Sequence, residues 1–182
     1  MQRKSFGKLF LIAIGYMVFG NLLSTIMTIS IAVVANVTFV QVIAFIFTTF
    51  IFYSLIFTAA YKDGVRERKM VHLKKVDEPN KMRWVNIGLL LWLVMALLAL
   101  ALFIDKAAGL WYDFLLVYRI VCGAVYPLSL LICGNTIDDM AAFVPLIFMA
   151  YYALIPLACR IGFKVGYEDK FNPDSIMYQK KQ

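Results

Sequence analysis

The sequence predicts an all-α integral membrane protein with four transmembrane helices and one re-entrant or interfacial segment. Of its 182 residues, 63% are hydrophobic and only 16% are charged, with a mean hydropathy of +0.80. Soluble domains carry far more charge than this. Between Lys8 and Lys62, 53 consecutive positions carry no charge. Since about 20 apolar residues cross a bilayer as a helix, this stretch holds two spans and a turn.

The first span is expected at residues 9–34 and the second at residues 39–61, because Asn36 and Thr38 interrupt the apolar run between them. A basic N-terminus followed by an apolar run is also the pattern of a signal peptide. The apolar run here is 27 residues long, whereas a signal core has roughly 7–15. We therefore expect the first span to be retained.

Residues 62–83 form the one sizeable hydrophilic loop, with eight basic and four acidic side chains. The first half of this loop can prolong the second helix into water, until Pro79 ends any continuing helix. The third span is expected at residues 84–104 and opens with Trp84, an aromatic residue typical of the membrane boundary.

Residues 110–135 are apolar enough to cross, but they carry Asp113 and Arg119 and are interrupted by Gly and Pro. An arginine at mid-bilayer costs about 2.5–3.5 kcal/mol on the insertion scale. We therefore expect a re-entrant or interfacial segment here, and a fifth span is the alternative.

The last span is expected at residues 137–163, with Thr136 as its N-cap and an acid three residues later. Pro145 and Pro156 lie on nearly one face of that helix and are expected to bend it. The tail at residues 164–182 is polar and basic.

The distribution of charge selects four spans over five. With four spans and both termini cytoplasmic, sixteen of the 18 Lys and Arg residues face the cytoplasm, and only Lys106 and Arg119 lie outside. With five spans the basic tail would face outwards, against the positive-inside rule. The sequence therefore predicts a multi-pass plasma-membrane protein with the 62–83 loop and both ends in the cytoplasm.

The candidate substrate or ion residues are Arg119, Asp138, Asp139 and Asp113. The aspartates would form an outward acidic cluster able to hold a cation or to transfer protons, but a helix cap explains Asp138 and Asp139 equally. Arg119 would bind a phosphate or carboxylate, or would extend towards the headgroups.

The 62–83 loop is a candidate docking surface for anionic lipid headgroups or for a partner protein, since each basic residue near the membrane adds roughly 1 kcal/mol of attraction. The alternative is that it only sets the topology. The residues concerned are Lys62, Arg66, Arg68, Lys69, Lys74 and Lys75.

Several polar residues lie inside the first two spans, where they either line a solute path or serve helix packing. They are Asn21, Ser24, Thr25, Thr28, Ser30, Gln41, Thr48 and Thr49.

No catalytic motif is present: the chain has no P-loop, no Gly-x-Ser-x-Gly elbow and no His-Glu-x-x-His helix. His72 is the only histidine, and Cys122, Cys133 and Cys159 lie in apolar segments without the spacing of a zinc or disulfide framework. We expect no metal, no cofactor and no nucleic-acid partner.

Two short patches show a resemblance. The first runs from Ala60 to Gly64 with Arg66 and Arg68, and the second comprises Gly166, Tyr167, Tyr178, Lys180 and Lys181. They resemble uncharacterised small integral membrane proteins of Gram-positive bacteria, which have a charged loop after a helical hairpin and a basic tail. The resemblance implies a bacterial plasma membrane and no particular activity.

The sequence favours a non-enzymatic membrane component: a subunit or accessory of a larger assembly, or a small transport or binding module. Other membrane subunits or further copies of the chain are expected partners, besides the bilayer itself and its anionic headgroups. The alternative is a membrane enzyme that acts on a lipid or envelope precursor at the outer face.

Overall fold

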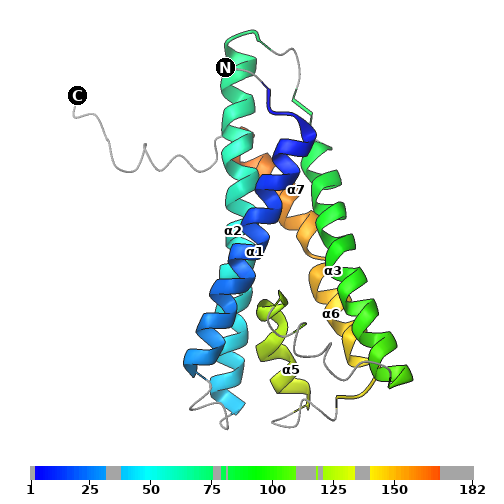
Figure 1. Ribbon diagram of the computed structural model, residues 1–182. Helices are drawn as coiled ribbons and strands as arrows, with labels where there is room; N and C mark the ends of the chain where they lie inside the picture. Colours follow the sequence, from blue (N-terminus) through cyan, green and yellow to red (C-terminus); the bar gives the residue numbers. More distant parts are fainter. Residues whose placement is uncertain are drawn as a thin grey trace, which may run out of the picture.

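The protein is a bundle of four membrane-spanning helical segments (Figure 1). This computed structural model describes residues 3–31, 38–75, 79–80, 82–109, 118, 121–133 and 140–168. No strand occurs among those residues. The helices are α1 (Phe6–Ile31), α2 (Thr38–His72), α3 (Arg83–Ala108), η2 (Gly123–Val125), α5 (Tyr126–Cys133), α6 (Val144–Tyr152) and α7 (Ile155–Glu168).

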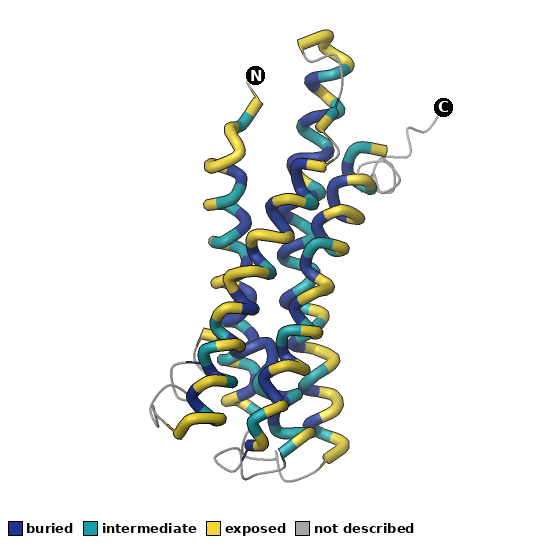
Figure 2. The backbone as a smooth tube through the Cα atoms, turned by 90° about the vertical axis from the view of Figure 1, so that its right-hand side faces the viewer, coloured by how far each residue is buried: buried dark blue, intermediate teal, exposed yellow. Residues whose placement is uncertain are grey.

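The prediction of four spans is confirmed. Helices α1, α2 and α3 are each long and apolar enough to cross a membrane, and α6 and α7 together form the fourth span over Val144–Glu168. The third helix occupies residues 83–108, and so begins one residue earlier and ends four residues later than its expected range of 84–104. Large apolar residues, among them Leu11, Phe39 and Phe50, are exposed, as contact with lipid requires. Exposed positions recur along the length of the helices (Figure 2).

Helix α2 is longer than the other spans, at 35 residues against 26 for both α1 and α3. A helix rises 1.5 Å per residue, so α2 measures about 52 Å and its neighbours about 39 Å. The surplus extends beyond the bundle at the end where the chain begins (Figure 1). The expected prolongation of the second helix beyond its span is therefore present, and it runs as far as His72.

The described part of the 110–135 region is a short piece of helix rather than a fifth span. Helices η2 and α5 cover residues 123–133, about 16 Å in length, which is roughly half the hydrocarbon thickness. Both pack against α1 and α2 at the end of the bundle away from the N-terminus (Figure 1). Inside the bundle, the amide of Ala124 donates to Asn21 Oδ1 of α1 at 3.2 Å.

The fourth span differs from its predicted form in two ways. Its helix begins at Val144 instead of near Ile137, and residues 140–143 are not helical. Pro145 therefore lies in the first turn of α6, where its missing N–H has no helical partner to lose, and it does not bend the helix. The break falls at residues 153–154, directly before Pro156 at the start of α7. The expected cap at Thr136 lies outside the described residues.

Glycine allows α7 to pack very closely against α2 and α3. A Cβ at Gly162 would lie 2.6 Å from the carbonyl oxygen of Phe57, and one at Gly166 would collide with the carbonyl of Tyr61. On α3, a Cβ at Gly88 would lie 2.6 Å from the Cα of Pro156. Small residues are the usual means of close helix packing in lipid, where no hydrophobic drive holds helices together.

Candidate functional site

Two acidic side chains of α2 point into the protein. They lie where α2 passes the first residues of the chain and the start of α3. Asp63 and Glu67 are one helical turn apart and therefore share a face. The side chains are almost fully buried, with 5% and 2% of their residue surface exposed. Buried carboxylates need partners, because an uncompensated charge away from water costs several kcal/mol.

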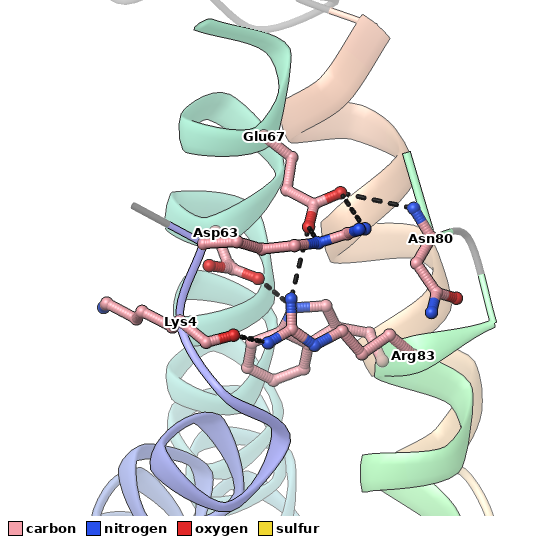
Figure 3. Close-up of polar contacts among 7 residues, drawn as sticks. Lys4, Asp63, Glu67, Asn80 and Arg83 are labelled. Atoms are coloured by element: carbon pink, nitrogen blue, oxygen red, sulfur yellow. Dashed lines mark hydrogen bonds and ion pairs between the residues drawn. The ribbon is translucent and has the colours of Figure 1, made fainter. Parts of the chain in front are cut away.

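Glu67 is held from three directions (Figure 3). Its Oε1 accepts from Arg3 Nε at 2.8 Å and from Arg83 Nη1 at 3.2 Å. Its Oε2 accepts from Arg3 Nη2 and from the backbone amide of Asn80, at 3.2 and 3.3 Å. Both carboxylate oxygens are thus occupied by groups of the protein itself.

The neighbouring groups extend this network (Figure 3). Trp84 Nε1 donates to Asp63 Oδ2 at 2.9 Å, and Arg83 Nη2 donates to the backbone carbonyl of Lys4. We call Arg3, Asp63, Glu67, Arg83 and Trp84 the clasp. It joins the N-terminal segment, α2 and α3 at one end of the bundle, and its two arginines balance its two carboxylates.

The exposed basic residues of the same stretch of α2 lie away from the two buried acids. Residues 66–75 form what we call the basic arm, which includes the part of α2 that extends beyond the bundle (Figure 1). Met70 of the arm is buried with the acids, whereas Lys69 and His72 are exposed. Of the other basic residues in the arm, Arg66 and Arg68 are half-buried, and Lys74 and Lys75 are exposed.

The arm ends in a defined helix stop. The amide of Lys75 donates to the carbonyl of Met70 at 3.0 Å, and that of Lys74 donates to Val71 at 2.9 Å. This pair of bonds is the Schellman motif, with Lys74 in the left-handed conformation at φ 52°. Glycine is the usual residue at that position, so a lysine here places a positive charge on the last turn at the cost of some backbone strain.

The four predicted substrate or ion residues, Arg119, Asp138, Asp139 and Asp113, all lie outside the described residues. Their roles stay predictions. The predicted docking residues lie instead in or directly before the basic arm, at the end of the bundle that carries the clasp.

The polar side chains inside the first two spans bond mainly to backbone carbonyls. Thr25 and Thr28 donate to the carbonyls four residues earlier in α1, at 2.9 and 2.8 Å. Thr48 donates to Ala44 at 2.9 Å within α2, and Ser24 reaches the carbonyl of Thr48 at 3.4 Å. These contacts favour the packing interpretation over a solute path.

No group of three His, Cys, Asp or Glu side chains among the described residues is placed to hold a metal ion. The three cysteines are free thiols, with Cys122 and Cys159 buried and Cys133 half-buried.

Sequence reasoning did not identify the clasp. Arg3 and Glu67 are 64 positions apart, and hydropathy says nothing of contacts over that distance. One local signal was available, because Asp63 and Glu67 at an (i, i+4) spacing place two acids on one face of a helix whose other faces are basic. Arg83 beside Trp84 at the entry to a span was a second signal.

Comparisons with protein-family models, with curated proteins and with solved structures find no match to this chain. The resemblance to small membrane proteins of Gram-positive bacteria therefore stays a prediction.

Proposed function

We propose that the chain is a non-enzymatic component of a larger membrane assembly and that it contacts an acidic partner protein through the basic arm. The observation that carries this proposal is the sorting of charge around one helix. Asp63 and Glu67, the only acids of α2, face inwards and bond to the other residues of the clasp. Lys69 and His72 face outwards. Because both acids of α2 are buried, they do not neutralise its exposed basic residues. The basic arm therefore presents a cationic surface, which attracts an anionic one.

The distance by which the arm extends beyond the neighbouring helices favours a protein over lipid as its partner. The end of α2 extends about 13 Å further than a helix of the length of α1 or α3 would. Headgroup layers add only about 5–8 Å on each side of the hydrocarbon core. Since charge attraction decays over a Debye length of about 8 Å at physiological salt, the tip is better placed to meet a protein in the aqueous phase.

The tight interior near α5 also supports an accessory role. A cavity between α1, α2 and α5, lined by Thr28, Gln41, Ala44 and Pro127 among others, has a volume of about 10 Å³. That is the space of about one water molecule. A solute path along this part of the bundle would need a larger opening.

The end of the bundle with the clasp and the arm faces the cytoplasm in this proposal. Three basic N-terminal residues, the arm, and Arg160 and Lys164 of α7 all gather there, whereas Lys106 lies at the other end of α3. Lys and Arg are retained on the cytoplasmic side during insertion. Both termini are then cytoplasmic.

Charge reversal of the arm tests the proposal. The variant carries Lys69→Glu and Lys75→Glu, both at exposed positions and neither in the clasp. Its matched control carries Lys8→Glu and Lys164→Glu, which are exposed lysines at the same end of the bundle. Full-length protein is cross-linked in cells, extracted in mild detergent and sized on native gels.

We expect the wild type and the control to run as a complex larger than the chain alone and the arm variant to run at a smaller size. A wild type that runs alone, or an arm variant that keeps the complex, would reject the proposal.

A further inference from the structure

At the base of the arm, Lys62 and Tyr16 form a contact between two lipid-exposed helices. Lys62 Nζ donates to the Tyr16 hydroxyl at 3.1 Å and lies 5.7 Å from the centre of its ring. Lys62 is exposed and Tyr16 is half-buried. Neither residue belongs to the clasp or to the basic arm.

The contact draws the ammonium group towards the membrane. Helix side chains lean towards the N-terminus of their own helix. Because α1 and α2 run antiparallel (Figure 1), Tyr16 leans towards the clasp end and Lys62 leans towards the middle of the bilayer. Tyr16 lies eight residues after Lys8, which is about 12 Å further along α1.

A lysine at the membrane boundary ordinarily extends its charge outwards to water, which is the opposite direction. The Tyr16 ring already gives the ammonium a cation–π contact, and an anion close to it would stabilise it further. The acids of the same turn of α2 do not supply one, because Asp63 bonds Trp84 and Glu67 bonds Arg3 and Arg83. Among the described residues, no carboxylate lies within ion-pair distance of Lys62.

The donor set matches one class of ligand. Tyr16 accepts the hydrogen bond from Lys62, so its own hydroxyl hydrogen is available to a further acceptor, and the ammonium has two more hydrogens. Lys62 is the first charged residue after the apolar part of α2, so we place these donors at the membrane boundary, where phospholipid phosphates lie. We infer that Tyr16 and Lys62 form a binding site for the phosphate of an anionic phospholipid, with its acyl chains along the exposed faces of α1 and α2.

Lipid binding to the purified full-length chain tests this inference. Protein in mild detergent is mixed with phosphatidylglycerol or with phosphatidylcholine at equal concentrations, and native mass spectrometry gives the first binding constant for each. The variants are Lys62→Gln and Tyr16→Phe, whose side chains lie outside the buried core. The control is Lys164→Gln, an exposed lysine at the same end that lies 3.9 Å from Glu168.

We expect the wild type to prefer phosphatidylglycerol and Lys62→Gln to weaken that binding about fivefold, to the level of phosphatidylcholine. Tyr16→Phe should weaken it about threefold, since it loses one hydrogen bond. Lys164→Gln should leave the preference unchanged. Equal losses in Lys62→Gln and Lys164→Gln would mean that only general charge attracts the lipid, which overturns the inference.

Inorganic phosphate distinguishes a lipid site from a free-anion site. At about ten times the lipid concentration it should leave phosphatidylglycerol bound, because a lipid is also held by its buried acyl chains. Complete displacement would assign the site to soluble anions and would likewise overturn the inference.

Discussion

The Glu67 carboxylate and the Arg83 guanidinium form an ion pair of 3.2 Å in which the side chains are only 2% and 8% exposed. Arg3 completes the arrangement from the N-terminal segment, with 36% of its side chain exposed. The pair joins two helices at the point where α2 leaves the bundle. The clasp therefore fixes the direction of the basic arm relative to α3.

Neutralising Glu67 should destabilise the protein strongly. Glu67→Gln leaves two arginine side chains without their shared carboxylate, and breaking a buried ion pair on one side costs about 3–5 kcal/mol. Glu168→Gln is the control, because its pair with Lys164 is 3.9 Å long and exposed, worth about 0.5 kcal/mol or less. Thermal unfolding in detergent measures both, and similar losses would show that the clasp is not a stabilising element.

The two arginines of the clasp should contribute unequally to the free energy of unfolding. Arg83→Ala removes a buried partner and its bond to the Lys4 carbonyl, whereas Arg3→Ala removes a partner that water can partly replace. We expect Arg83→Ala to lower the free energy of unfolding by at least twice as much as Arg3→Ala. Equal losses in a denaturant titration would contradict this order.

Glycines at the α7 contacts should not tolerate a methyl group. Gly162→Ala and Gly166→Ala place a Cβ against backbone atoms of α2 and should cost about 1–3 kcal/mol each. Gly7→Ala and Gly15→Ala are matched controls, since nothing lies within 4 Å of a Cβ at either position. Alanine there should be neutral or stabilise by up to about 1 kcal/mol. Unfolding midpoints of the four variants test this prediction.

The indole N–H of Trp84 should contribute more to the free energy of unfolding than that of Trp92. Trp84→Phe leaves the buried Asp63 carboxylate without its donor, at a cost of about 1–3 kcal/mol. Trp92 donates to the carbonyl of Met149, which also accepts from the amide of Ala153, so Trp92→Phe should cost about 1 kcal/mol or less. A larger loss in Trp92→Phe, measured by unfolding in detergent, would reverse this assignment.

Asn21 should hold the short helices of the 123–133 segment in place. Asn21→Leu removes the acceptor of the Ala124 amide and should raise the hydrogen exchange rate of that amide. It should also lower the free energy of unfolding by about 1–3 kcal/mol. Ser30→Ala is the control, because the Ser30 hydroxyl donates to the carbonyl of Ile26 in its own helix. Unchanged exchange at Ala124 in Asn21→Leu would refute this role.

The sequence was informative wherever structure depends on local composition. The four spans and the prolongation of α2 follow from runs of apolar residues and from the first charges after Tyr61. The start of the last helix was misplaced, because a good capping pattern near Thr136 competes with the fixed backbone of Pro145, which suits a first helical turn.

The clasp was beyond sequence reasoning for a different reason. Which of several arginines pairs with Glu67 depends on how three segments meet, and no pattern within one helix contains that information. The contact of Tyr16 with Lys62 likewise spans 46 positions and requires the antiparallel packing of α1 on α2.

The uninterrupted course of α2 has a mechanical consequence. One helix of 35 residues runs from beside η2 and α5 at one end of the bundle to the basic arm at the other. The clasp holds α2 at Asp63 and Glu67, and Glu67 lies about 44 Å along the helix from its first residue and about 8 Å from its last. A small displacement of α2 beside residues 123–133 would therefore tilt the helix about the clasp, and its last residue would move in the opposite direction by only about a fifth of that distance.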